Sequence, residues 1–190
     1  AGAAVEVNAI GSGDSENMWV YNNSSLVDGV SFTASYTPSG TAEAESSVDV
    51  AVAYTGYDGL TLGYANGEDN AVAGTGSFDS DTMYATYAYG PVTVGYQVSE
   101  IEGNTATNTD EATYYGVTYA ITDSLSVGYG ESSIDLGSST TDQETSNISF
   151  SYTMGGMTLA GGFVDQENVG GSTATIDDRK GYAFDLSFAF

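Results

Sequence analysis

The chain has 190 residues, a net charge of −24, and neither histidine nor cysteine. Without these two residue types it cannot build a Ser-His-Asp or Cys-His nucleophile or a thiolate or imidazole zinc site, so we expect no enzyme. Twenty-six carboxylates against only Arg179 and Lys180 repel a phosphate backbone, which excludes nucleic acid as a partner. The 41% hydrophobic content likewise excludes a disordered acidic tail.

The length predicts a single domain over residues 1–190. The sequence contains no run of eighteen or more apolar residues, so we expect no transmembrane helix. The segment AGAAVEVNAI begins with Ala1 and has neither a basic region nor a continuous apolar core. Either a signal peptide has been removed or the chain is a fragment.

Apolar residues alternate with small or polar ones along almost the whole chain, which is the period of a β-strand. Eleven such runs are expected to form strands, and no segment shows a helical period. In chain order they lie within residues 18–22, 30–36, 48–54, 60–64, 83–89, 92–99, 114–121, 124–130, 147–154, 157–163 and 182–190. Residues 3–10 are a candidate twelfth strand.

Two kinds of connection alternate between the expected strands. Tight hairpin turns are predicted at residues 56–59, 89–91, 122–123 and 155–156, where glycine, proline and aspartate gather. Long polar loops are predicted at about residues 38–46, 65–80, 100–111, 131–145 and 165–180. These loops carry most of the acids, so they are candidate Ca²⁺ sites, although neither GEDN nor TDEA has EF-hand spacing.

The two faces of the expected strands differ in a way that favours a membrane barrel over a soluble sandwich. One face is mostly Gly, Ser, Thr and Ala with almost no long charged side chain, which is typical of a water-filled lumen. Asp49 and Asp185 project to this face and are candidate pore-lining residues. The other face carries Val, Leu, Ile and Phe, with tyrosines near the strand ends as in an interfacial girdle. The expected girdle is Tyr36, Tyr54, Tyr64, Tyr89, Tyr96, Tyr129 and Tyr152.

Three segments carry a family resemblance: NMWVYNNSSLVDGV, TYYGVTYAITDSLSVGYG and the ending YAFDLSFAF. They are similar to segments of the Gram-negative porin family, especially its alphaproteobacterial type, although Ser24 stands where such porins usually have proline. The resemblance implies a transmembrane, up-and-down antiparallel β-barrel in the bacterial outer membrane. It also implies a homotrimer that contacts lipid and lipopolysaccharide. The ending resembles the signal read by the barrel-assembly machinery, formed here by Tyr182, Phe184, Leu186, Phe188 and Phe190.

Porins of this type have sixteen strands, and the resemblance therefore bears on how many strands this chain holds. Counting back eleven strands from Phe190 places residues 19–22 on the sixth strand. Residues 1–16 would then end the constriction loop that folds into the lumen, with Glu6, Asp14 and Glu16 lining the pore. The first five strands would be absent. The competing count takes residues 3–10 as a strand and gives a twelve-stranded barrel.

The resemblance implies a passive, water-filled channel for small hydrophilic solutes, without a cofactor. An acidic rim without a basic counter-wall predicts a preference for cations. The alternative is a secreted, acidic, calcium-binding or adhesive β-sheet protein. A third reading is a closed barrel without a pore, because Tyr84 and Tyr114 are bulky and face the expected lumen.

Overall fold

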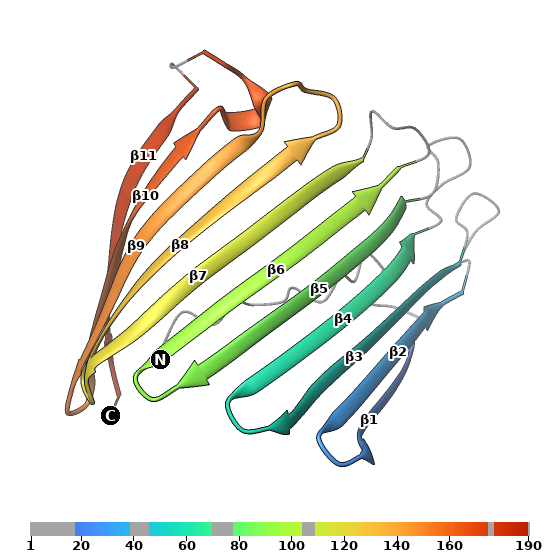
Figure 1. Cartoon of the computed structure of the whole chain (residues 1–190), viewed down its shortest axis with the longest axis horizontal. Coiled ribbons are helices and arrows are strands. Elements are labelled where there is room, and N and C mark those ends of the chain that lie inside the picture. The colour runs from blue at the N-terminus through green and yellow to red at the C-terminus, as the bar shows by residue number, and fades with distance from the viewer. Residues whose placement is uncertain (1–17, 39–45, 70–77, 104–108, 175–176, 190) are drawn as a thin grey trace.

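The computed structural model describes residues 18–38, 46–69, 78–103, 109–174 and 177–189, in which eleven strands form one antiparallel sheet. Their spatial order follows the chain from β1 to β11 (Figure 1). Within the described residues no helix is long and apolar enough to span a membrane. The strands are β1 (Trp19–Val27), β2 (Val30–Thr37), β3 (Ser47–Tyr57), β4 (Leu60–Asp69), β5 (Phe78–Tyr89), β6 (Val92–Glu102), β7 (Asp110–Thr122), β8 (Leu125–Leu136), β9 (Gln143–Met154), β10 (Met157–Glu167) and β11 (Arg179–Phe188).

The observed topology confirms the predicted all-β, up-and-down architecture, and each of the eleven expected runs overlaps one strand. Strands β1 and β11 form the two edges of the described sheet, which is therefore open. The candidate twelfth strand at residues 3–10 lies outside the described residues, as do Glu6, Asp14, Glu16 and Phe190.

Two-residue turns join the strands at one end of the sheet. At Asp58–Gly59 the glycine has φ +75°, and a Cβ there would lie 2.2 Å from the carbonyl oxygen of Ala88, so only glycine fits. The predicted turn at residues 122–123 is wrong by one position, because the turn residues are Asp123 and Ser124. Thr122 is the last residue of β7, and its hydroxyl accepts hydrogen bonds from the backbone N–H groups of Ser124 and Leu125.

At the opposite end the strands extend further than predicted. The segments expected as long acidic loops from about residue 65 onward belong in part to the strands β4 to β10, and thirteen acids expected in loops lie on these strands. The pattern of large apolar residues ends where these acids begin, but backbone pairing continues, as between Glu68 and Asp79 or between Glu100 and Glu111. Hydrophobic periodicity therefore marks the apolar part of each strand rather than its hydrogen-bonded length.

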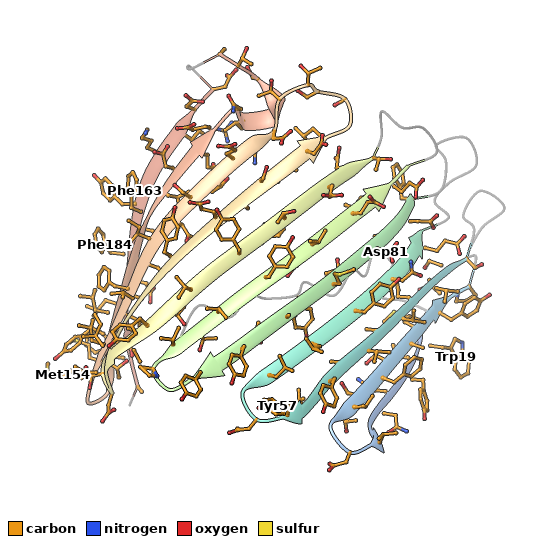
Figure 2. All side chains as sticks on the ribbon, viewed as in Figure 1. Trp19, Tyr57, Asp81, Met154, Phe163 and Phe184 are labelled. Carbon is orange, nitrogen blue, oxygen red and sulfur yellow. The ribbon has the colours of Figure 1, made fainter. Side chains whose placement is uncertain are left out.

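The sheet is curled (Figure 1). Its large apolar side chains are exposed. Among the described residues no hydrophobic side chain is buried, and the buried polar side chains are those of Ser47, Ser80 and Thr82. Figure 2 shows Phe163 and Phe184 pointing away from the curled sheet. Apolar residues outside and small polar residues inside are the arrangement expected where lipid surrounds the protein.

Two neighbouring positions on β7 test this assignment of faces. Val117→Lys, on the apolar face, should destabilise the membrane-inserted protein by about 2–4 kcal/mol, because it places an ammonium in hydrocarbon. Thr118→Lys, on the opposite face, should be tolerated because Thr118 borders the hollow of the sheet and lies opposite Gly128. The measurement is the heat-modifiable migration of each full-length variant on a detergent gel and its urea midpoint. Equal losses for both variants would contradict the assignment.

Candidate functional site

The concave face of the sheet encloses a hollow of about 1000 Å³ over strands β4 to β9. Apart from Ile101, its inward side chains are hydroxyls, amides and two phenols, including Tyr84, Gln97, Ser99, Tyr114 and Asn147. Glu100 and Glu131 also border it, but strand alternation directs their side chains to the outer face. This face, called the inner wall below, is therefore uncharged and polar along its middle.

Two acids predicted to line a pore lie on the same face as the small polar residues. Asp49 of β3 lies between Ser35 and Gly67 in the sheet register and accepts a hydrogen bond of 2.7 Å from the Ser35 hydroxyl to its Oδ2. Asp185 of β11 lies opposite Ala160. The two acids are not neighbours in the sheet, because the seven strands β4 to β10 lie between β3 and β11. Their role in a pore stays a prediction.

The seven tyrosines of the expected girdle all lie on the exposed apolar face. Their exposed fractions run from 36% for Tyr54 to 76% for Tyr89. Register partners on this face are large as well: Tyr96 lies opposite Tyr115, and Tyr64 lies opposite Val52. An interfacial role for these rings remains a prediction.

Sequence reasoning missed a feature of the outer face, which we call the carboxylate belt. On each strand from β4 to β10 the outward positions change from apolar to acidic within a few residues, on the side away from the tight turns. In Figure 2 Asp81 lies near this end, whereas Tyr57 and Met154 lie near the tight turns. The belt comprises Glu68, Asp79, Asp81, Glu100, Glu102, Glu111, Glu131, Asp135, Glu144, Asp165 and Glu167. Strand parity could have revealed it, because every one of these acids continues the apolar face of its own strand.

The sheet register places many belt carboxylates directly opposite one another. Asp81 faces Glu100, Glu100 faces Glu111, and Glu111 faces Asp135, so four acids form one row across four strands. Like charges at directly opposed positions are destabilising. Tyrosines partly offset this repulsion, since the Tyr64 hydroxyl donates a 2.5 Å hydrogen bond to Asp81 Oδ1 and the Tyr129 hydroxyl donates to Glu131.

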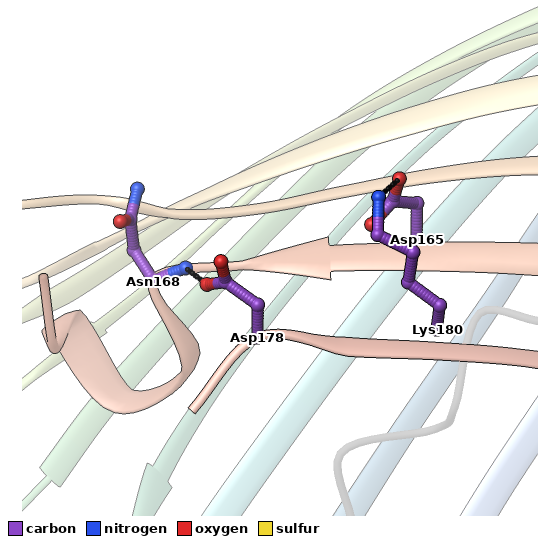
Figure 3. Close-up of polar contacts among 4 residues, drawn as sticks. All are labelled: Asp165, Asn168, Asp178 and Lys180. Carbon is purple, nitrogen blue, oxygen red and sulfur yellow. Dashed lines mark hydrogen bonds and ion pairs between the residues drawn. The ribbon is translucent and has the colours of Figure 1, made fainter. Parts of the chain in front are cut away.

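Basic partners are scarce near the belt. Lys180 Nζ lies 2.6 Å from Asp165 Oδ2, and this is the one side-chain ion pair among the described residues (Figure 3). Beside it, the backbone N–H of Asn168 donates a 3.0 Å hydrogen bond to Asp178 Oδ1 at the start of the 3₁₀ turn Val169–Gly171. No group of three acids in the described ranges is arranged to hold a metal ion, so the calcium expectation gains no support from this part of the chain.

Comparisons with known proteins agree with the two-faced sheet. The sequence model of the Gram-negative porin family matches residues 1–182. Among solved structures, OmpF of Salmonella typhi in complex with daunomycin aligns with a TM-score of 0.69 and 15% identity over 90% of this chain and 61% of that chain. A porin refined at 1.8 Å resolution aligns with a TM-score of 0.65 and 17% identity over 91% of this chain and 60% of that chain. The outer membrane channel DcaP of Acinetobacter baumannii aligns with a TM-score of 0.64 and 14% identity over 89% of this chain and 60% of that chain. No curated protein sequence matches.

The fold and the family match define an outer-membrane β-barrel protein. The chain belongs to the Gram-negative porin family, which confirms the predicted resemblance and the outer-membrane location. This membership also agrees with the exclusion of enzymatic activity and disagrees with the secreted alternative. The chain spans about three fifths of the length of the porins it matches.

The like-charge row gives a prediction about stability. Glu100→Gln removes the charge that faces both Asp81 and Glu111, and should stabilise the folded protein by about 0.5–1 kcal/mol at low salt. Added salt should shrink this gain, because screening already weakens the repulsion in the wild type. The measurement is the urea midpoint in detergent at low and high salt. Asp123→Asn in a tight turn is the control, and an equal gain there, or a gain at Glu100 that persists in high salt, would contradict the explanation.

Proposed function

We propose that this chain forms the greater part of a water-filled outer-membrane channel through which small hydrophilic solutes diffuse passively. The observation that carries the proposal is the inner wall, which consists mostly of small and polar residues over β4 to β9 and borders a hollow of about 1000 Å³. A barrel without a pore would fill this space with side chains, as small closed barrels do. Family membership and the porin-like fold support the same function.

We further propose that the channel prefers cations. By strand parity the inward face of the described strands carries the carboxylates Asp49, Asp110 and Asp185 against Arg179 as the one base on that face of the described residues. Carboxylates lining a cation pathway attract positive ions and repel negative ones. The net charge of −24 adds a negative potential around the entrance.

The proposed assembly is a homotrimer in contact with outer-membrane lipid and lipopolysaccharide. Exposed apolar side chains on both edge strands, Trp19 at 76% and Phe184 at 68%, support contact with lipid or with another subunit. The alternating aromatic and apolar residues of β11 support recognition by the barrel-assembly machinery. Calcium at the acidic outer end remains a prediction, to be tested by the effect of a chelator on the thermal midpoint.

The experiment is a recording of the full-length protein in planar lipid bilayers. The wild type should conduct, and its reversal potential in a salt gradient should show a cation preference. Asp49→Asn with Asp185→Asn should lower the cation-to-anion permeability ratio by up to about fivefold, since a unit charge near the ion path contributes about 1 kcal/mol in a watery lumen. Asp58→Asn in a tight turn is the control. No conductance would overturn the channel, and an unchanged ratio in the double variant would overturn the role of these two acids.

A further inference from the structure

One row of side chains crosses the middle of the inner wall from β4 to β8. In the register, Gly63 lies opposite Tyr84, Tyr84 opposite Gln97, Gln97 opposite Tyr114, and Tyr114 opposite Ser132. Directly opposed residues of neighbouring strands have Cβ atoms about 4.5–5.5 Å apart. The row therefore places one carboxamide between two phenol side chains, with small or hydroxyl residues on either side.

The carboxamide at the centre of the row has unused hydrogen-bonding capacity. Gln97 Nε2 donates a 3.0 Å hydrogen bond to Ser99 Oγ, which also accepts a 3.0 Å hydrogen bond from Thr82 Oγ1. The other carboxamide atom, Gln97 Oε1, is buried and accepts no hydrogen bond from the described residues, so a solute reaches it when the carboxamide turns toward the hollow. A buried acceptor without a partner costs about 1–3 kcal/mol, and such groups in native structures call for an explanation.

Space for a solute is present beside this row. Gly63 leaves room for the ring of Tyr84, since a Cβ at Gly63 would lie 2.0 Å from Tyr84 Cε1. Tyr114 is 37% exposed and borders the hollow together with Gln97 and Asn147. A volume of about 1000 Å³ is at the upper end of the range found for small-molecule sites.

The chemistry of the row selects a class of solute. Phenol rings offer flat apolar faces, while carboxamide, hydroxyl and phenol O–H groups offer both donors and acceptors. The inward positions at the centre of this wall carry no charge, so the row has little attraction for an ion. A compact, uncharged molecule with apolar C–H faces and several hydroxyl groups matches these features.

We propose that the row of Tyr84, Gln97 and Tyr114 is a binding station for neutral polyhydroxylated solutes of mono- or disaccharide size. It rests on the proposed channel function and deepens it by naming a solute class. Ions and sugars then use different parts of the wall, because Asp49 and Asp185 lie on β3 and β11, on either side of the uncharged middle of β5 to β7. A sugar bound at the row narrows the ion path without competing for these carboxylates.

The test is the reduction of single-channel current by sucrose in the full-length porin, corrected for the bulk conductivity of the same solution. The wild type should show a saturable reduction, and gluconate at the same concentration should show a much weaker one. Gln97→Ala and Tyr114→Ala should each raise the half-saturating sucrose concentration about tenfold, the factor for a lost interaction of about 1.4 kcal/mol.

The matched control is Tyr115→Ala, which removes the adjacent tyrosine from the outer face and should leave the half-saturating concentration unchanged. Two variants at separate positions keep the test decisive if one of them does not fold, as judged by heat-modifiable migration. A conducting wild type without saturable sucrose block would overturn the binding station and leave the channel intact. Block that is equally affected in Tyr115→Ala, or unaffected in both inner variants, would also overturn it. A silent wild type would overturn the channel itself.

Discussion

In hydrocarbon every backbone N–H and C=O group must find its hydrogen-bond partner within the protein, because no water is available there. The described sheet meets this requirement for the inner strands β2 to β10, which are paired with a neighbour on both sides, whereas the edge strands β1 and β11 are paired on one side. Everything else in the structure follows from that ladder. Because successive side chains of a paired strand point to opposite faces, one face meets lipid and the other meets water. Hence the described residues form no buried apolar core, and most of their large apolar side chains are on the outer face.

The carboxylate belt shows where that lipid-facing rule ends. On β8 the outer face changes from Tyr129 to Glu131, and on β10 from Phe163 to Asp165, although both strands continue beyond these residues. A charge is costly at the middle of the bilayer and cheap near its edge, so the first acid on each strand marks the apolar boundary. Tyrosine is suited to this boundary, since its ring stays among the apolar residues while its hydroxyl reaches a carboxylate, as in the pair Tyr64 and Asp81.

The sequence was sufficient to predict the number and order of the strands in the described residues. The alternation of apolar with small or polar residues can be found in the sequence without knowing which strands are in contact. It was insufficient for strand ends, because an acid on the outer face has the composition of a loop but the hydrogen bonding of a strand. Glu100 and Glu111 were expected in one loop and instead face each other across β6 and β7. The parity of these acids was visible in the sequence, but composition outweighed it.

The central row of the inner wall was only partly within reach of the sequence. The two-residue turn at Gly90–Pro91 fixes the register of β5 and β6, so the pairing of Tyr84 with Gln97 follows from turn length alone. The pairing of Gln97 with Tyr114 does not, because β6 and β7 are joined through residues 103–109, whose length leaves the register open. Tyr84 and Tyr114 were therefore visible as bulky luminal residues, which suggested a blocked barrel. Their shared row was hidden.

The position of Tyr84 and Tyr114 in this row argues against a role in blocking the pore. A ring that blocked a pore would need to cross it, yet the space left by Gly63 lets the Tyr84 ring lie over the neighbouring strand, along the wall. Lying along the wall, an aromatic ring narrows the lumen little and exposes its edge and face to a passing molecule. The charged positions on β3 and β11 then act on ions over a long range, whereas the neutral row acts only on molecules that touch it. A wall divided in this way lets one channel set its ionic preference and its affinity for neutral solutes independently.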